Sequence, residues 1–116
     1  MNILIFGTTG LLGRDLYELA NFSHRVFNGK ISNKPRIDLT KQHEIWHYFE
    51  HLKQEHGILP DVVINCAGDI GGINNNISTG FDKLYNNALI GLNVVKTCQD
   101  YKIPKLINIS SACTYP

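Results

Sequence analysis

Short apolar runs alternate with amphipathic stretches along the whole chain. Runs of apolar and β-branched residues predict strands at Ile3–Phe6, His24–Phe27, Arg36–Leu39, Asp61–Asn65 and Lys105–Ile109, of which the third is brief. In Asp61–Asn65 the apolar residues face both ways, which is typical of a strand buried on both faces of a parallel sheet.

Apolar residues at helical spacing predict a helix between most of these strands, over Leu11–Ala20, from Thr40 to Gly57, and over Phe81–Tyr101. We expect Thr40 to cap the second helix. The apolar stripe of that helix contains Ile45, Tyr48, Phe49 and Leu52. Two polar or glycine-rich segments, Asn28–Pro35 and Gly68–Gly80, are expected to be loops.

This alternation predicts an α/β fold in which right-handed crossovers build a Rossmann-like, doubly wound parallel sheet of order 3-2-1-4-5. Its 116 residues suffice for one domain with one core. A covering helix is expected after the last strand. We therefore expect residues 1–116 to be the N-terminal part of a longer protein, truncated after the fifth strand and without its substrate region.

The segment between the first strand and the first helix has the spacing G-x-x-G-x-x-G, from Gly7 to Gly13. Gly7 allows a sharp turn, Gly10 allows backbone to approach a phosphate, and Gly13 allows the helix to pack close to the strand. A tight turn that needs glycine for its own geometry would show the same residues. The position between strand and helix favours a site for a dinucleotide pyrophosphate.

The residues after the second strand bear on the choice of cofactor. NAD sites often carry a carboxylate there for the ribose 2′-hydroxyl. This chain has Asn28-Gly29-Lys30 instead, with Lys34 and Arg36 nearby. Cations without a carboxylate suit a 2′-phosphate, so NADP is the expected cofactor, and NAD remains possible.

Composition excludes several other classes of function. The net charge of +1 and the lack of a basic run give no support for nucleic-acid or membrane-surface binding. The sequence shows no apolar run long enough to cross a bilayer and no secretory signal at its start. Three widely spaced cysteines fit neither a zinc site nor a disulfide framework, so we expect a cytoplasmic protein.

Four segments together resemble the extended short-chain dehydrogenase/reductase family. They are Gly7–Gly13, Asn65–Gly68, Asn87 within the long helix, and Ser110–Pro116. Gly71-Gly72-Ile73 and the Ser-x-Cys-x-Tyr-Pro ending are similar to the GDP-L-fucose synthase branch of that family. The N-terminal run up to Gly7 is also similar to dTDP-4-dehydrorhamnose reductases.

The resemblance implies two catalytic residues. Ser111 would donate a hydrogen bond to a carbonyl oxygen that gains charge during hydride transfer, and Cys113 would move protons beside the sugar carbonyl. A serine at a strand end and a small buried cysteine are the structural alternatives. The family's Tyr-x-x-x-Lys pair is expected beyond Pro116, so Tyr115 is not that tyrosine.

The resemblance and the glycine turn together give a set of candidate cofactor-binding residues. They are Gly7, Thr8, Thr9, Gly10, Leu11, Leu12, Gly13, Lys30, Asp38, Leu39, Ala67, Gly68, Ile70, Asn87, Ile109 and Ser110. The small size of Ala67 and Gly68 equally fits close backbone packing. Thr9 departs from the family, in which fucose synthases carry a basic residue at this place.

Two helices carry further patterns. His43, His47 and His51 recur every four residues, opposite the apolar stripe, so we expect them to face solvent and assign no metal. The helix over 81–101 is apolar on more than one side: Leu84, Ala88, Leu92 and Val95 form one stripe, and Gly91 would allow another helix to approach. One side would cover the sheet and another would form a homodimer, as the resemblance also implies.

These observations predict an NADP-dependent reductase or epimerase of a nucleotide-diphospho-4-keto-6-deoxy sugar, of which this chain carries the cofactor-binding part. A nucleotide sugar is the expected substrate and partner, with neither nucleic acid nor membrane. The alternatives are a non-catalytic nucleotide-binding module and an enzyme of the dTDP-4-dehydrorhamnose reductase type.

Overall fold

The computed structural model describes the backbone of residues 1–68 and 73–109, and the side chains of these ranges except 73–80. Its strands are β1 (Asn2–Phe6), β2 (Arg25–Phe27), β3 (Val62–Asn65) and β4 (Lys105–Asn108). They form one parallel sheet of order β2-β1-β3-β4. All four carboxyl ends therefore lie at the same edge, which is where open α/β sheets bind their ligands.

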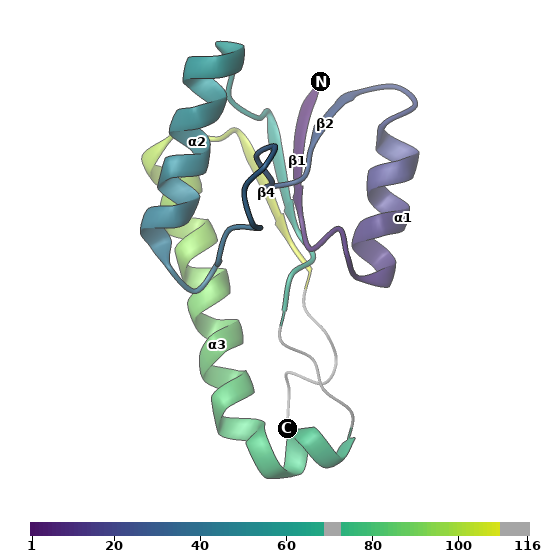
Figure 1. Cartoon of the computed structure of the whole chain (residues 1–116), viewed down its shortest axis with the longest axis vertical. Coiled ribbons are helices and arrows are strands. Elements are labelled where there is room, and N and C mark those ends of the chain that lie inside the picture. Colours follow the sequence, from purple (N-terminus) through teal and green to yellow (C-terminus); the bar gives the residue numbers. More distant parts are fainter. Residues whose placement is uncertain (69–72, 110–116) are drawn as a thin grey trace.

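Three helices pack on the two faces of this sheet: α1 (Leu11–Ala20), α2 (Gln42–His56) and α3 (Ile73–Asp100). Figure 1 shows α1 on one side of the sheet and α2 and α3 on the other. This arrangement confirms the predicted doubly wound α/β fold.

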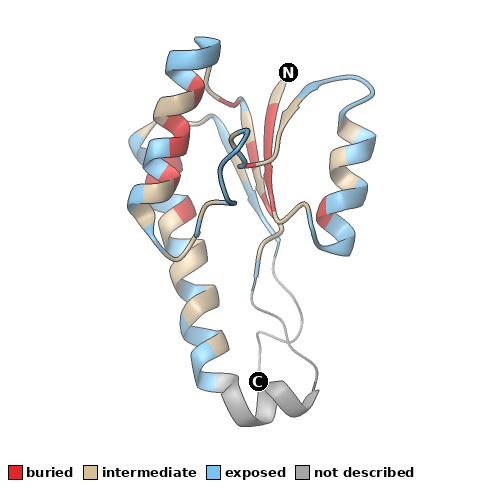
Figure 2. Ribbon diagram, in the orientation of Figure 1, coloured by how far each residue is buried: buried red, intermediate tan, exposed pale blue. Residues whose placement is uncertain are grey.

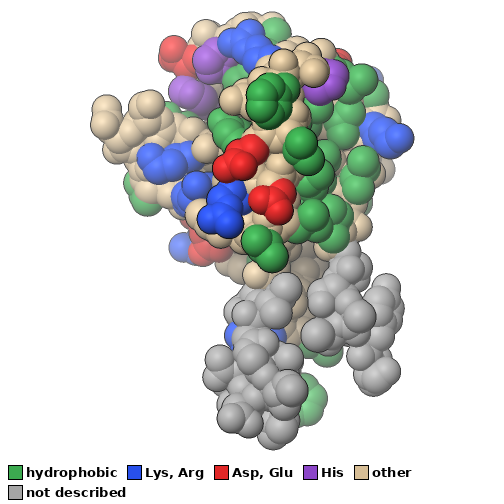
Figure 3. Space-filling model, turned by 90° about the vertical axis from the view of Figure 1, so that its right-hand side faces the viewer, with side chains coloured by type: hydrophobic (Ala, Val, Ile, Leu, Met, Phe, Trp, Pro, Cys, Tyr) green, Lys and Arg blue, Asp and Glu red, His purple; other side chains and the backbone are tan. Residues whose placement is uncertain are grey.

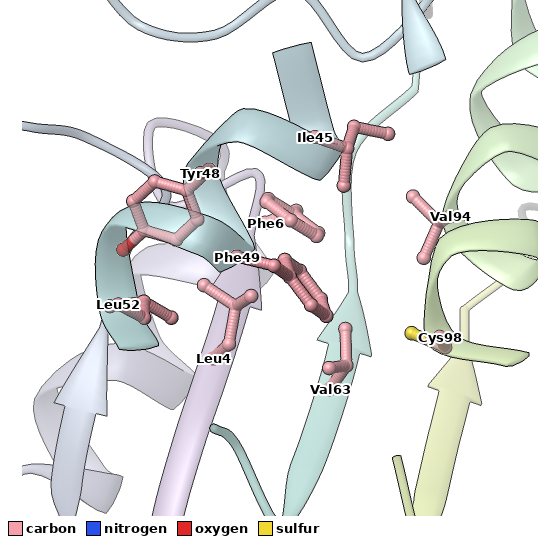
Figure 4. Close-up of a cluster of buried hydrophobic side chains, with 9 residues drawn as sticks. All are labelled: Leu4, Phe6, Ile45, Tyr48, Phe49, Leu52, Val63, Val94 and Cys98. Carbon is pink, nitrogen blue, oxygen red and sulfur yellow. The ribbon is translucent and has the colours of Figure 1, made fainter. Parts of the chain in front are cut away.

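The main core lies between the sheet and α2 with α3. Leu4, Phe6 and Val63 point from one face of the sheet toward the predicted stripe of α2 (Figure 4). The buried members of this core are Leu4, Phe6, Ile45, Tyr48, Phe49, Leu52, Val63, Val94 and Cys98. The α2 stripe is thereby confirmed, and Figure 2 shows most of the buried residues between these elements.

The opposite face of the sheet is covered less. In α1, which the structure describes in full, Gly13 is the only buried residue. Leu11, Leu12 and Leu19 are exposed, and Figure 3, viewed from this side, shows hydrophobic side chains gathered at the surface. Gly13 allows α1 to approach β1 closely, and Ile3 and Ile5, which alternate with Leu4 and Phe6 along β1, are buried on this face.

The predicted strand at Arg36–Leu39 is wrong, and β2 is an edge strand of the sheet. Local hydrogen bonds occupy this segment instead. The Asp38 amide donates to Glu44 Oε1 at 2.9 Å, and the Lys41 amide donates to the Asp38 carbonyl at 3.0 Å. Such bonds between side chains and nearby backbone compete with pairing to a sheet.

Two details of the helices also differ from the predictions. The residue at the N-cap of α2 is Lys41 rather than Thr40, whose hydroxyl and amide both donate to Asp38 Oδ1. Helix α3 begins at Ile73, inside the segment expected to be the loop Gly68–Gly80. Asparagine and glycine are poor helix formers, but intrinsic propensity is a weak guide that the surrounding structure overrides.

The sequence suggested that Gly91 allows another helix to approach, but in the structure this residue faces a strand. A Cβ at this position would lie 4.0 Å from Nδ2 of Asn108, so Gly91 faces β4.

Within the described ranges, no helix is long and apolar enough to cross a membrane.

Candidate functional site

The glycine turn joins β1 to α1 at the carboxyl edge of the sheet. Gly7 has a φ of +86°, and a Cβ there would lie 2.6 Å from the Ala67 amide nitrogen, so the turn requires glycine. A Cβ at Gly13 would collide with the Gly7 carbonyl oxygen. The roles predicted for Gly7 in the turn and Gly13 in packing are both confirmed.

Gly10 is different from the other two glycines. Its φ of −77° and ψ of 167° are open to any residue. A Cβ at Gly10 would lie 3.5 Å from the Gly7 oxygen, which is ordinary contact, and the residue is exposed. The geometry of the turn does not explain this glycine, whereas a ligand lying against the backbone would.

The N-terminus of α1 starts at the same point. Gly10 is its N-cap, no described side chain caps the helix, and its first turn contains no acidic residue. The first amides of a helix lack partners within the helix and carry a partial positive charge. With Leu11 and Leu12 exposed, these amides suit the phosphate groups of a nucleotide.

The loop after β2 is held in place by a hydrogen bond to the buried Tyr48 of α2. The buried Gly29 amide donates to the Tyr48 hydroxyl at 3.2 Å, and Gly29 has a φ of +76°. Burial raises the pKa of Tyr48 to about 12, so the hydroxyl stays protonated. The Lys30 amide donates to Asn28 Oδ1 at 3.1 Å, and the Lys30 side chain is exposed next to this anchor.

Arg36 links this region to the glycine turn. Its Nη1 donates to the Thr8 hydroxyl at 3.2 Å. The exposed guanidinium therefore lies beside the glycine turn. The sequence had put Arg36 only among the nearby cations, because the distance between positions 8 and 36 closes only in the fold.

Asp38 and Leu39 follow in the same loop. Asp38 Oδ1 accepts from the Thr40 hydroxyl at 2.6 Å, and this hydrogen bond lowers the pKa of the carboxyl. The Leu39 carbonyl accepts from Asn93 Nδ2 at 3.0 Å, which ties the loop to α3. Both residues are thus fixed at the carboxyl side of β2, where they remain candidates for contact with a nucleotide.

The ends of β3 and β4 bring a pair of asparagines together. Asn65 Nδ2 donates to Asn108 Oδ1 at 2.8 Å, and Asn65 Oδ1 accepts from the Ala67 amide at 3.1 Å. The Ile109 amide donates to the Asn65 carbonyl at 2.9 Å. Sequence reasoning missed this pair. The signal that could have revealed it is that each asparagine lies at or next to the end of a predicted apolar strand.

The remaining candidates are placed as follows. Ala67 is half-buried and Gly68 exposed after β3, and Asn87 is half-buried on α3. Burial raises the pKa of the Cys66 thiol, which lies just past β3, and raises that of Cys98 to about 11. Neither thiol is activated as a nucleophile. Ile70, Ser110, Ser111 and Cys113 lie outside the described residues.

The histidines of α2 do not form a metal site in the part of the chain described. His43 and His47 are exposed, as predicted, whereas His51 is half-buried and stacks on Tyr48, with ring centroids 6.4 Å apart.

Tyr101 and Lys105 have the spacing Tyr-x-x-x-Lys, but they lie away from the carboxyl edge. The Tyr101 hydroxyl donates to Glu50 at 2.8 Å, and Lys105 is the first residue of β4. These residues therefore do not have the position expected of a catalytic pair, which is the carboxyl edge.

Comparison with known proteins adds to this geometry. A family model described as "NAD dependent epimerase/dehydratase family" matches residues 3–116. The chain is 31% identical over 116 residues to GDP-L-colitose synthase of Yersinia pseudotuberculosis, covering 100% of this chain and 35% of that protein. It is 35% identical over 114 residues to GDP-L-fucose synthase of Azorhizobium caulinodans, covering 98% and 34%.

A solved structure, that of DdhaC, superposes with a TM-score of 0.79 and 32% sequence identity, covering 99% of this chain and 31% of that one. The chain spans about a third of the length of the curated relatives it matches.

Proposed function

Because the chain belongs to the NAD-dependent epimerase/dehydratase family, we propose that it carries the cofactor-binding part of an NADP-dependent reductase or epimerase. The match confirms the resemblance to extended short-chain dehydrogenases/reductases. The proposed substrate is a nucleotide-diphospho-4-keto-6-deoxy sugar, and the similarity to GDP-L-colitose and GDP-L-fucose synthases supports this class.

Gly10 is the observation that carries the proposal for cofactor binding. The turn has room for a side chain there, and its backbone angles are ordinary, yet the residue is glycine. A pyrophosphate lying against the amides of the first turn of α1 would need that space. The glycine turn, with Thr8, Thr9, Leu11 and Leu12, is the proposed pyrophosphate site.

The preference for NADP rests on charge after β2. Lys30 and Arg36 are both exposed after β2, and Arg36 contacts Thr8 of the glycine turn. Two carboxylates lie near Arg36 in the sequence or the fold: Asp38 Oδ1 accepts from Thr40, and Glu44 Oε1 accepts from the Asp38 amide. Two cations favour the dianionic 2′-phosphate over a ribose hydroxyl.

The proposed chemistry combines the cofactor with residues near the end of β4. A nicotinamide cofactor supplies a hydride to a ketone when it is bound. Ser111 follows Asn108 by three residues and would donate a hydrogen bond to the ketone oxygen as its negative charge grows. Cys113 would move a proton beside the same carbonyl during epimerisation.

A homodimer through α3 is part of the proposal. Leu84, Ala88, Leu92 and Val95 lie at intervals of four, four and three residues, and all four are exposed. They form a solvent-facing apolar stripe, whereas Val94 and Cys98 face the core. Such a stripe suits packing against the same stripe of a second copy.

The test is a titration of the chain with NADPH and NADH, followed by an assay of NADPH oxidation. The assay offers GDP-4-keto-6-deoxymannose and dTDP-4-dehydrorhamnose in parallel. Tighter binding of NADPH and turnover of the GDP sugar by the protein that contains this chain would support the proposal. NADPH binding with turnover of neither sugar by that protein would instead favour a non-catalytic module.

A further inference from the structure

The Asn65–Asn108 amide pair lies at the carboxyl ends of the neighbouring strands β3 and β4. Asn65 is 2% exposed, whereas Asn108 is exposed at the last position of β4. The residues are partners in the parallel register, so both side chains lie on the same face of the sheet. Central parallel strands are usually apolar throughout, and a buried carboxamide is costly unless its hydrogen bonds are satisfied.

The Asn65 carboxamide makes hydrogen bonds to two segments, the end of β4 and the residues that follow β3. Its Nδ2 donates to Asn108 at 2.8 Å, and its Oδ1 accepts from the Ala67 amide at 3.1 Å. Ala67 is also the residue whose amide nitrogen limits the space at Gly7. One side chain therefore fixes the exit from β3, the exit from β4 and the wall of the glycine turn relative to one another.

The strand order shows which part of a dinucleotide this bridge faces. In the order β2-β1-β3-β4, the glycine turn follows β1, and the cations Lys30 and Arg36 follow β2 on one side of it. A dinucleotide with its pyrophosphate at the turn and its 2′-phosphate by these cations extends its other half across β3 and β4. The amide pair is at the ends of those two strands.

We infer that Asn65 and Asn108 are positioning residues for the nicotinamide half of the cofactor, an inference that rests on the proposed function. Hydrogen bonds to Asn65 hold the backbone of Ala67 and Ile109 in place, and this spacing would orient a ring bound between the two segments. Neither side chain takes part in bond making. Their effect is on the half of the cofactor that lies over β3 and β4.

The test compares two ligands on variants of Asn108, which is the exposed member of the pair. NADPH spans the whole site, whereas adenosine 2′,5′-bisphosphate fills the β2 side and lacks the nicotinamide. Asn108→Leu removes the acceptor for Asn65, and Asn108→Asp keeps an acceptor oxygen in the same place. Asn108→Ala is a second variant, to be used if the leucine lowers the melting temperature.

We expect Asn108→Leu or Asn108→Ala to weaken NADPH binding by about fivefold to tenfold, the factor that one hydrogen bond is worth. Binding of adenosine 2′,5′-bisphosphate should stay unchanged, and Asn108→Asp should restore NADPH affinity. Equal loss of both ligands, or no loss of NADPH, would overturn the inference. If the unaltered chain binds neither ligand, the proposed function itself fails, and the inference fails with it.

Discussion

The Arg36 guanidinium donates a hydrogen bond to the Thr8 hydroxyl, and the two groups are 3.2 Å apart. Twenty-eight residues separate these positions in the sequence. The contact brings a cation to the turn that follows β1, on the side of β2. A 2′-phosphate bound there would accept from this guanidinium.

Arg36→Met should therefore lower the affinity for NADPH and leave that for NADH unchanged. Hydrogen bonds to charged groups are worth about 1.5–3 kcal/mol, so we expect NADPH to bind at least about tenfold more weakly. Isothermal titration calorimetry with both cofactors measures the ratio. Arg25→Met is the matched control, because Arg25 contacts His56 at the other end of β2. An unchanged ratio of the two affinities would remove Arg36 from the site.

Two glycines of the same turn should respond to substitution in opposite ways. Gly10→Val should abolish NADPH binding while the melting temperature changes little, because the turn accommodates a Cβ there. Gly13→Ala should lower the free energy of unfolding by about 1–3 kcal/mol or more, because its Cβ collides with backbone. Thermal denaturation and fluorescence titration distinguish the two effects. Full NADPH affinity in Gly10→Val would show that no ligand uses this space.

Tyr48→Phe should destabilise the chain by about 1–3 kcal/mol, because the buried Gly29 amide loses its acceptor. Urea denaturation at neutral pH measures this difference. The same change should also weaken NADPH binding, since the loop that presents Lys30 loses its anchor. Tyr85→Phe is the control, because it removes a hydroxyl from a tyrosine of α3 that is 66% exposed. Equal losses of stability in the two variants would argue against the anchor.

The raised pKa of Tyr48 predicts a loss of stability in alkali. The ordinary value of 10 applies to the unfolded chain and about 12 to the folded one, so the unfolded state releases this proton first as pH rises. The contribution of Tyr48 is complete below pH 10 and is lost between pH 10 and about 12. The unfolding free energy of Tyr48→Phe should fall less steeply over this window, and parallel curves would contradict the prediction.

The apolar stripe of α3 makes a prediction about assembly. Leu92 is 66% exposed and lies in the middle of the stripe, so Leu92→Lys should convert a dimer into a monomer. Sedimentation equilibrium across a range of concentrations measures the mass. Leu19→Lys on α1 is the control, because Leu19 is 67% exposed on the other side of the sheet. If both variants keep the mass of the unaltered chain, this stripe is not an interface.

Much of the fold could be predicted because its signals are local. The apolar run of β1, the stripe of α2 and the order of the glycines each reflect a repeat or a turn that neighbouring residues determine. The brief strand at 36–39 failed because Asp38 and Glu44 bind local backbone, which no periodicity records. The first turns of α3, from Ile73, were predicted to be a loop because asparagine and glycine, which are frequent there, are poor helix formers.

The candidate site also contains a part that local sequence signals predict and a part that they do not. Residues of the glycine turn were predictable because they are contiguous and follow a strand. The contact of Arg36 with Thr8 and that of Asn65 with Asn108 were not predictable, because they join residues that are 28 and 43 positions apart, respectively. Only the order of the strands brings such positions to one edge.

The thin packing of α1 has a consequence for how the molecule moves. Gly13 is the one buried residue of α1, which is fully described, whereas α2 buries the four residues of its stripe, so we expect α1 to open more easily than α2. Weakly packed elements open without global unfolding, and their amides exchange hydrogen fastest. The helix proposed to present its N-terminus to a phosphate would thus also open more easily than α2. A bound anion would close this opening and protect the amides of α1, so that ligand binding would be reported as slowed exchange in a single helix.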